Sequence, residues 1–299
     1  MRISNRFLTF DRNSKLLLLL NKLNIPYKEE EKSYSETVKS YSLEFYLYED
    51  DPYFQDKYIQ MSEYNIEPQI RTEFSKQDEE NAEWFDIGTG QFGYPQPEDD
   101  YFELTYAKEN VCFHCNIGKR QINEFRLRGE PKQKHSHFLG LNWVFDEIFI
   151  RDVVKDVFEK ENIKGIHYSN PVLNKSGKPL ETIQQIRVET ILQPGLVTDN
   201  LKSENCVRPS EEWIAYRLKT DPTYLDNPFC GQKKYYYPER GFKTFKKEIF
   251  INQPDFVKTY EWFGNGGGAT RPILISKKVR DIIKQQKWRG AYFEPIALV

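Results

Sequence analysis

Two stretches in the second half of the chain repeat the same pattern of apolar positions. The segments EIFI (147–150) and PILI (272–275) are short, apolar and rich in β-forming residues, so we expect each to be a strand. After each strand, apolar residues recur at helical spacing and predict a short amphipathic helix. These helical positions are Val153, Val154, Val157 and Phe158 in the first copy and Val279, Ile282 and Ile283 in the second.

Each predicted helix is followed by a glycine and then by another short strand. Gly165 and Gly290 stand where a helix commonly ends in a left-handed residue. Ser276 is a suitable N-cap for the second helix, and Asp152 is the corresponding candidate for the first. The strands that follow are IHY (166–168) and AYF (291–293).

The two stretches align at a constant offset, which places Gly165 on Gly290 and Ile150 on Ile275. Upstream, the alignment places Phe138 on Phe256 and Trp143 on Trp262. This internal repeat predicts an α+β fold that is strand-rich, with a duplicated strand–strand–helix–strand unit. The predicted domains are an acidic N-terminal α+β region (1–104), a first repeat unit (105–205) and a second repeat unit (206–299).

Acidic and basic residues are unevenly distributed on the two sides of residue 104. Residues 1–104 carry 11 Lys/Arg against 22 Asp/Glu, and residues 105–299 carry 32 against 23. The acidic region either docks on the basic part or faces a partner. Within it, LLLLL predicts a helix capped by Asn13 or Ser14 and ended by Pro26, and the aromatic segment 41–54 predicts a strand that runs into a turn.

The cysteines suggest a metal site. Cys112 and Cys115 form a C-x-x-C turn, and Cys230 aligns with Cys115 in a second turn that has Asn227 in place of the other cysteine. Two such turns brought together give tetrahedral thiolate coordination of zinc. Cys206 is the candidate for the missing sulfur, so the predicted metal ligands are Cys112, Cys115, Cys206 and Cys230. Further candidates are His114, His135 and His137, and the alternative is a pair of vestigial turns with reduced thiols.

A duplicated C-x-x-C-G turn followed by a strand–helix–Gly–strand–Pro ending resembles the double-CxxCG motif proteins of myxobacteria. The ending ILISKKVRDIIKQQKWRGAYFEPI (273–296) is also similar to that of bacterial polymorphic-toxin immunity proteins. The resemblance covers roughly residues 105–299. It implies that the protein neutralises a toxin by direct binding and is not an enzyme. The chain departs from the doubled motif at Asn116, where glycine is expected, and at Asn227.

Two segments are candidates for partner binding. The loop 88–101 combines an aromatic side chain with an acidic run, which would steer a basic toxin such as a nuclease. The Gly-rich segment 264–272 is an insertion in the second repeat, and such insertions often form the binding face. The predicted partner-binding residues are Tyr94, Glu98, Asp99, Asp100, Asn265 and Arg271.

A second functional hypothesis is a zinc-ribbon-like nucleic-acid-binding protein, whose salt-sensitive binding would distinguish it from a toxin binder. The basic residues available for it are Lys119, Arg120, Arg126, Arg128, Lys132 and Lys134. The chain has no Ser–His–acid spacing, H-E-x-x-H motif or nucleophile elbow, so we do not expect an enzyme. Its longest apolar run is Leu16–Leu20 and no signal-peptide pattern occurs, which predicts a cytoplasmic protein without a membrane partner.

Overall fold

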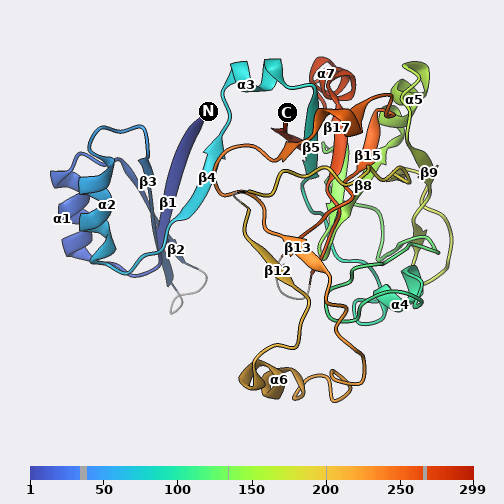
Figure 1. Ribbon diagram of the computed structural model, residues 1–299, viewed down its shortest axis with the longest axis horizontal. Helices are drawn as coiled ribbons and strands as arrows, with labels where there is room; N and C mark the ends of the chain where they lie inside the picture. Colours follow the sequence, from blue (N-terminus) through green and yellow to red (C-terminus); the bar gives the residue numbers. More distant parts are fainter. Residues whose placement is uncertain (34–38, 134, 200, 265–267) are drawn as a thin grey trace. The chain divides into compact units, whose positions relative to one another are not determined.

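The computed structural model describes all residues except 34–38, 134, 200 and 265–267 (Figure 1). The chain has an α+β fold in two compact units. The N-terminal unit contains Met1–Asn81 and Pro238–Phe242, and the C-terminal unit contains Ala82–Tyr237 and Lys243–Val299. These units divide after Asn81, whereas the sequence analysis ends the acidic region at residue 104. Across the described residues, no helix combines the length and apolar character needed to cross a membrane.

The N-terminal unit is a four-stranded antiparallel sheet, in the order β2-β3-β1-β4, with helices packed against it. The predicted helix is present as α1, and the Asn13 side chain caps it by accepting hydrogen bonds from two backbone N–H groups. Leu16 and Leu20 of α1 are buried against Phe7 and Phe45. The elements are β1 (Arg2–Thr9), α1 (Ser14–Lys22), β2 (Tyr27–Ser33), β3 (Lys39–Tyr48), α2 (Phe54–Ser62), β4 (Gln69–Glu73) and α3 (Lys76–Asn81).

In its described residues the C-terminal unit contains two further four-stranded sheets, one three-stranded sheet and two short strand pairs. Its helices are α4 (Tyr101–Thr105), α5 (Asp152–Lys160), α6 (Glu211–Arg217) and α7 (Lys277–Gln285), with a 3-10 turn at Lys247–Phe250. Its strands before residue 200 are β5 (Trp84–Thr89), β6 (Arg126–Leu127), β7 (Phe138–Leu141), β8 (Val144–Arg151), β9 (His167–Ser169), β10 (Val172–Leu173) and β11 (Ile183–Arg187). The remaining strands are β12 (Ser203–Asn205), β13 (Lys233–Tyr235), β14 (Thr244–Phe245), β15 (Phe256–Lys258), β16 (Trp262–Phe263), β17 (Ile273–Ser276), β18 (Ala291–Pro295) and β19 (Ala297–Leu298).

The two repeats have the same strand pairing. The first forms the sheet β7-β8-β11-β9 and the second forms β15-β17-β5-β18. Phe138 pairs with Ile150 in the first sheet, and Phe256 pairs with Ile275 in the second, at the positions that the sequence alignment makes equivalent. The helices α5 and α7 follow β8 and β17 and lie at the same end of the sheets in Figure 1.

The third strand of each sheet comes from outside the repeated segment. In the first sheet it is β11, which follows the repeat, and in the second it is β5, which precedes both repeats. Both strands run antiparallel to their neighbours on each side. Ile186 of β11 pairs with Tyr168, and Ile87 of β5 pairs with Phe293, so the two added strands also have equivalent register.

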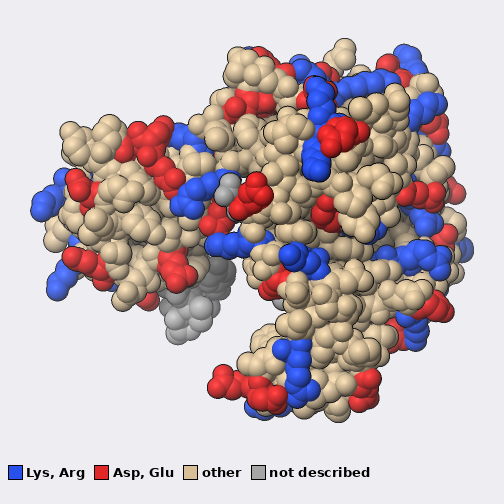
Figure 2. Space-filling view, in the orientation of Figure 1, with Lys and Arg blue, Asp and Glu red and all other residues tan. Residues whose placement is uncertain are grey.

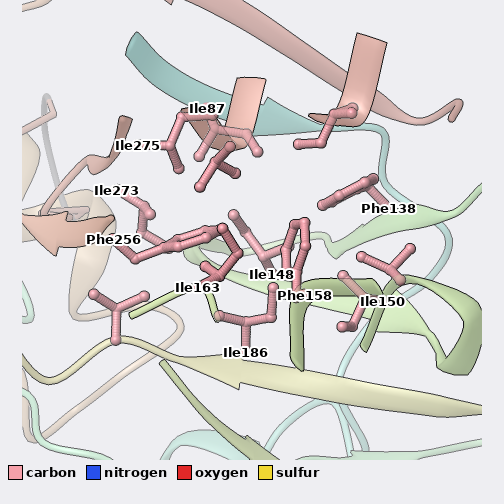
Figure 3. Packing of buried hydrophobic residues seen from close by; sticks show 14 of the residues in the cluster. Ile87, Phe138, Ile148, Ile150, Phe158, Ile163, Ile186, Phe256, Ile273 and Ile275 are labelled. Atoms are coloured by element: carbon pink, nitrogen blue, oxygen red, sulfur yellow. The ribbon is translucent and has the colours of Figure 1, made fainter. Parts of the chain in front are cut away.

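The two repeats share one hydrophobic core (Figure 3). Ile148 and Ile150 of the first sheet and Ile273 and Ile275 of the second sheet contribute to it, and all four side chains are buried. Phe158 of α5 packs against the second repeat, with its ring 5.9 Å from that of Phe256. Neither repeat could bury its apolar face alone, so the duplication is itself the source of the core.

The repeats also contact each other through reciprocal backbone contacts. The Phe138 N–H donates to the Arg289 carbonyl at 3.1 Å, and the Phe256 N–H donates to the Lys164 carbonyl at the same distance. Next to these carbonyls lie Gly290 and Gly165, with φ values of +98° and +88°. The prediction that these glycines end the helices is wrong: the first left-handed residues after α5 and α7 are Asn162 and Lys287, with φ of +55° each, and the glycines lie three residues further on. A Cβ at Gly290 would lie 2.1 Å from the Phe138 oxygen, and one at Gly165 would lie 2.3 Å from the Phe256 oxygen.

Gly290→Ala is therefore expected to lower the free energy of unfolding by at least about 3 kcal/mol, because it adds a backbone clash to a left-handed conformation. The matched control is Gly177→Ala, where φ is +67° and no atom lies within 4 Å of the added Cβ. Gly177→Ala should lower the free energy of unfolding only by the cost of a left-handed alanine, about 1–2 kcal/mol. Equal denaturation midpoints for the two variants would contradict the close approach of the repeats.

Two details differ from the sequence prediction. Ser276 is the N-cap of α7, as predicted, but Asp152 is not a cap: it is the first residue of α5, and its carboxylate accepts a hydrogen bond from Gln184. Trp143 and Trp262 do not occupy equivalent places. Trp143 lies in the tight turn between β7 and β8 and is exposed, whereas Trp262 is buried on β16.

Candidate metal centre

The first C-x-x-C segment folds into a compact turn. The Cys112 N–H donates to the Ile117 carbonyl at 2.9 Å, and the Asn116 N–H donates to the Cys112 carbonyl at 2.8 Å. Asn116 has φ of +61°, so it occupies the left-handed position for which glycine is expected. Asparagine tolerates this conformation better than most residues do, so the departure from the doubled motif does not prevent the turn.

The second pair of cysteines is held by a β-ladder. Strands β12 and β13 are antiparallel, and the ladder continues beyond them where the Cys206 N–H donates to the Gln232 carbonyl at 2.9 Å. The Gly231 N–H donates in turn to the Cys206 carbonyl at 2.9 Å. Gly231 has φ of +67° directly after Cys230, as Asn116 has directly after Cys115. The residue after Cys230 therefore keeps the left-handed conformation seen after Cys115, and Cys206 supplies the sulfur that Asn227 does not.

These two elements bring together all four predicted metal ligands. The Sγ atoms of Cys112 and Cys206 are 3.6 Å apart, those of Cys115 and Cys230 are 3.7 Å apart, and all four lie within 4.8 Å of one another. The thiols are free, and the separations far exceed a disulfide bond of about 2.05 Å. Sulfurs about 3.8 Å apart are what a tetrahedron with metal–sulfur bonds of about 2.3 Å requires. The cluster thus has the geometry of a four-cysteine metal site.

The surroundings of the cluster are mostly apolar. Cys112, Cys115 and Cys206 are buried with Ile117 and Trp262, whereas Cys230 is exposed. Such a shell excludes water from three of the sulfurs and restricts access to the side of Cys230. Restricted access of this kind is typical of closed structural sites rather than of catalytic ones.

The thiols differ in their acidity. Burial raises the pKa of Cys112, but backbone N–H groups of His114, Cys230 and Cys115 oppose it and bring this pKa down to about 7. Burial raises the pKa of Cys115, and it raises the pKa of Cys206 to about 11. Cys112 therefore ionises readily near neutral pH, whereas the other two thiols need a bound cation to remain thiolates.

The histidine candidates are placed elsewhere. His114 Nε2 is 2.9 Å from the Asn227 carbonyl oxygen, and its ring stacks on Phe229 at 3.7 Å. This contact joins the first turn to the position of the missing cysteine. His137 Nδ1 accepts a hydrogen bond from the Arg289 N–H, and His135 is exposed. Within the described part of the chain, the group with metal-binding spacing consists of cysteines.

No family model matches this chain, and no curated protein matches it either. The resemblance to immunity proteins therefore rests on the sequence motifs alone.

The acidic loop predicted to bind a partner lies at the surface. Glu98, Asp99 and Asp100 are exposed, and Tyr94 is 43% exposed. The Tyr94 ring contacts Trp143 edge-on, with centroids 4.7 Å apart, and the Tyr101 ring stacks on Trp143 with centroids 6.0 Å apart. We call this set of six residues the aromatic–acidic surface.

Trp143 was missed as a candidate because the repeat alignment places it on a buried tryptophan. It is 48% exposed and has φ of +67°, a conformation that is unfavourable for a bulky residue. Glycine or asparagine would suit this turn better. Neither burial nor turn geometry therefore explains a tryptophan here, and strained exposed residues often have functional roles.

The other two predicted partner residues are not part of this surface. Asn265 lies outside the described residues. Arg271 is half-buried and lies over the Trp262 ring, 4.3 Å from its centroid, where it lines a cavity described below.

Not all of the basic residues proposed to bind nucleic acid are available for phosphate contacts. Lys119 is buried and forms an ion pair with Asp146 at 2.8 Å, and Arg128 lies 3.9 Å from Glu98. Lys134 lies outside the described residues. On the face drawn in Figure 2, blue and red side chains are interspersed over the coloured residues. Lys119 in particular could not reach a phosphate without leaving Asp146 buried and unpaired.

Proposed function

We propose that this protein is a zinc-stabilised binding protein of the toxin-immunity type, which acts by covering its partner and not by catalysis. The observation that carries the proposal is the pair of exposed aromatic side chains Tyr94 and Trp143, backed by the half-buried Tyr101, beside three acidic side chains. Aromatic residues, tryptophan and tyrosine above all, dominate the affinity of protein interfaces. Adjacent charges mainly set the association rate and the choice of partner.

Zinc is the metal that suits the cysteine cluster. Four thiolates in a tetrahedral arrangement are the typical ligands of structural zinc, which has no redox chemistry. Here the ion would join the turn at Cys112–Cys115 to the base of the segment 207–229, which carries α6 beyond β12 and β13 (Figure 1). Its role would be to hold these segments together, with no part in a reaction.

The charge of the aromatic–acidic surface favours a basic partner. Glu98 has one cation nearby, Arg128 at 3.9 Å, while Asp99 and Asp100 form no ion pair within the part of the chain that the structure describes. A toxin domain that binds nucleic acid is basic for its own function, so it would be attracted to this surface.

A nucleic-acid-binding role is less well supported. Such a role requires several accessible cationic side chains, whereas Lys119 forms a buried ion pair with Asp146. The aromatic rings that could stack on bases lie beside carboxylates, which would repel a phosphate backbone.

Trp143→Gly is expected to weaken toxin binding by at least about 30-fold, because it removes a central anchor worth about 2 kcal/mol or more. The fold should be retained, since glycine suits the positive φ of this turn. The measurement is a pull-down and growth-rescue assay with the toxin domain encoded by the neighbouring gene, alongside a melting curve. Reversing Glu98, Asp99 and Asp100 to lysine should slow association most at low salt.

The matched control is Trp213→Ala on α6. Trp213 is 47% exposed and stacks on Tyr216, so it is an equally accessible aromatic residue away from the acidic loop. It should leave binding unchanged. Full growth rescue by Trp143→Gly, or loss of binding in Trp213→Ala instead, would remove the aromatic–acidic surface from the interface.

A further inference from the structure

The C-terminal unit contains a cavity of about 370 Å³ next to the cysteine cluster. Its walls come from the segment 119–121, which follows the first cysteine turn, from strands β8, β11 and β15, and from Trp262 and Arg271. Trp262 also packs against the cysteines, so the cavity and the metal centre share one wall. This volume lies in the range of sites that bind small molecules, which begins at about 300 Å³.

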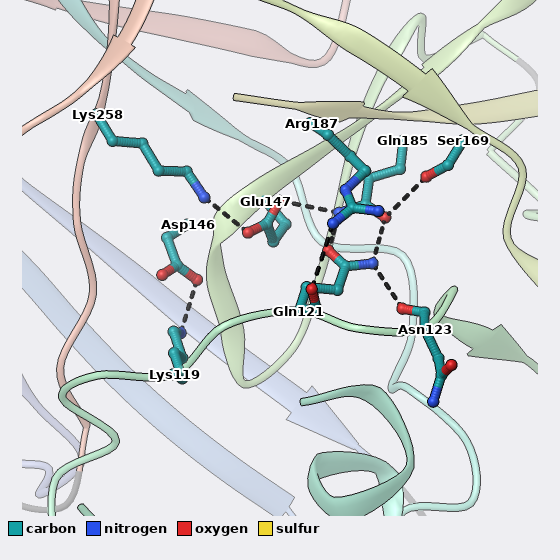
Figure 4. A network of polar contacts seen from close by, with 9 residues as sticks. All are labelled: Lys119, Gln121, Asn123, Asp146, Glu147, Ser169, Gln185, Arg187 and Lys258. Carbon is teal, nitrogen blue, oxygen red and sulfur yellow. Dashed lines mark hydrogen bonds and ion pairs between the residues drawn. The ribbon is translucent and has the colours of Figure 1, made fainter. Parts of the chain in front are cut away.

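Two of the acidic side chains that line this cavity form ion pairs with its lysines (Figure 4). Lys119 pairs with Asp146 at 2.8 Å and Lys258 pairs with Glu147 at 2.7 Å. The second Glu147 oxygen accepts from Gln185 at 2.9 Å. The Asp146 and Glu147 carboxylates thus have their partners already, and both are buried.

Three arginines line the same cavity without a carboxylate bound to them in the described structure: Arg120, Arg187 and Arg271. Arg187 donates to the Gln121 carbonyl at 3.3 Å, and Arg271 lies over the Trp262 ring. The lining has five cationic side chains and three acidic ones, the third being Glu189. The cavity therefore has an excess of positive charge.

Two polar groups in the wall are buried without a hydrogen-bond partner among the described residues. They are the Tyr106 hydroxyl and the Arg271 Nε. Tyr106 is 3% exposed, and burial, with the nearby Asp146 and Glu147 charges, raises its pKa well above the ordinary value. It therefore keeps its proton and can donate, and the arginine can only donate. Buried donors are nearly always satisfied in folded proteins, so an acceptor is expected at this place.

We propose that this cavity binds a small organic anion through a carboxylate or phosphate group that accepts hydrogen bonds from Arg271 and Tyr106. An oxyanion within reach of both groups would satisfy these donors and balance the arginines that have no carboxylate partner in the described structure. Arginine is suited to the group because its planar fork matches carboxylate and phosphate oxygens. The site is separate from the aromatic–acidic surface and does not depend on a toxin partner.

The test is isothermal titration of the full, metal-loaded chain with inorganic phosphate and, in a second arm, with glutarate. Sodium chloride at matched ionic strength and the neutral diamide of glutarate are the controls. We expect saturable binding of at least one anion and none of the diamide. Binding of phosphate alone assigns a phosphorylated ligand, and binding of glutarate alone assigns a carboxylate ligand.

Arg271→Gln should weaken the binding at least about tenfold, and Tyr106→Phe, which removes one oxygen, should weaken it about fivefold or more. Arg208→Gln is the matched control, since Arg208 pairs with Glu211 away from the cavity. If Arg271→Gln lowers the melting temperature and so cannot be interpreted, the affinity of the Tyr106→Phe variant tests the proposal. Absence of saturable binding in both arms, or unchanged affinity in Arg271→Gln and Tyr106→Phe, would overturn the proposal.

Discussion

Removing the metal with a chelator is expected to lower the melting temperature of the C-terminal unit by roughly 10 °C or more. The cysteines that meet at 3.6 and 3.7 Å are 94 and 115 residues apart along the chain. An ion that joins such distant segments restricts the unfolded chain strongly. Structural zinc contributes about 10–16 kcal/mol in zinc-finger peptides, and even a third of that would shift the melting temperature of a domain of this size by the stated amount.

Cys115→Ser should reproduce the effect of the chelator, because Cys115 is 1% exposed at the centre of the cluster. Returning zinc to the chelated wild-type protein should restore its melting temperature, and magnesium should not. His135→Ala is the matched control and should keep both metal and stability. A Cys115→Ser protein with the same melting temperature as the wild type would contradict a metal-dependent fold.

Asp146→Asn is expected to lower the free energy of unfolding by about 3–5 kcal/mol, because it leaves a buried lysine without its counter-charge. Asp146 is 3% exposed, and the Lys119 side chain with which it pairs is only 8% exposed. The measurement is chemical denaturation at neutral pH. The double variant Asp146→Leu with Lys119→Met should recover most of the loss, since a buried pair can often be replaced by apolar residues.

The contribution of the Asp146–Lys119 ion pair to the free energy of unfolding should depend on pH. Burial raises the pKa of Asp146, but the charges of Lys119 and Lys258 outweigh it and hold this pKa below its ordinary value. A carboxylate with a depressed pKa stabilises the fold above its unfolded pKa of about 3.9, and this contribution is lost as the pH falls below it. The difference between wild type and Asp146→Asn should therefore narrow below about pH 4. A difference that stays constant with pH, or that is absent at pH 7, would contradict the ion pair.

The duplicated unit could be predicted because its pattern is local. A short apolar strand segment, a helical stripe and a glycine occur together within about thirty residues. The structure pairs the strands of the two repeats in the same way and places Gly165 and Gly290 at equivalent positions. The glycines do not terminate the helices, which end at the left-handed residues Asn162 and Lys287; instead, each glycine allows the other repeat's backbone to approach.

The source of the third strand in each sheet could not be predicted from the same pattern. Strand β5 precedes both repeats, and its pairing with β17 and β18 depends on contacts made across most of the chain. Strand β2 was missed for a different reason. The sequence of β2 is YKEEEKS, which lacks the apolar alternation of a half-buried strand because β2 lies at the edge of its sheet.

The cysteine cluster was predicted by spacing and number. The C-x-x-C turn identified two ligands, the repeat identified Cys230, and Cys206 was the remaining cysteine in the chain. The aromatic–acidic surface was predicted only in part, because exposure of Trp143 depends on a tight turn that the alignment obscured. The cavity at Arg271 depends on side chains that are far apart along the chain, from Tyr106 to Arg271, and no local pattern indicates it.

The most direct test of this account is elemental analysis of the full chain purified without chelator, together with a thiol titration under native conditions. We predict one zinc per chain and protection of the thiols, and loss of the zinc in Cys115→Ser. Less than about a tenth of an equivalent of zinc, or iron in its place, would contradict the proposed zinc centre.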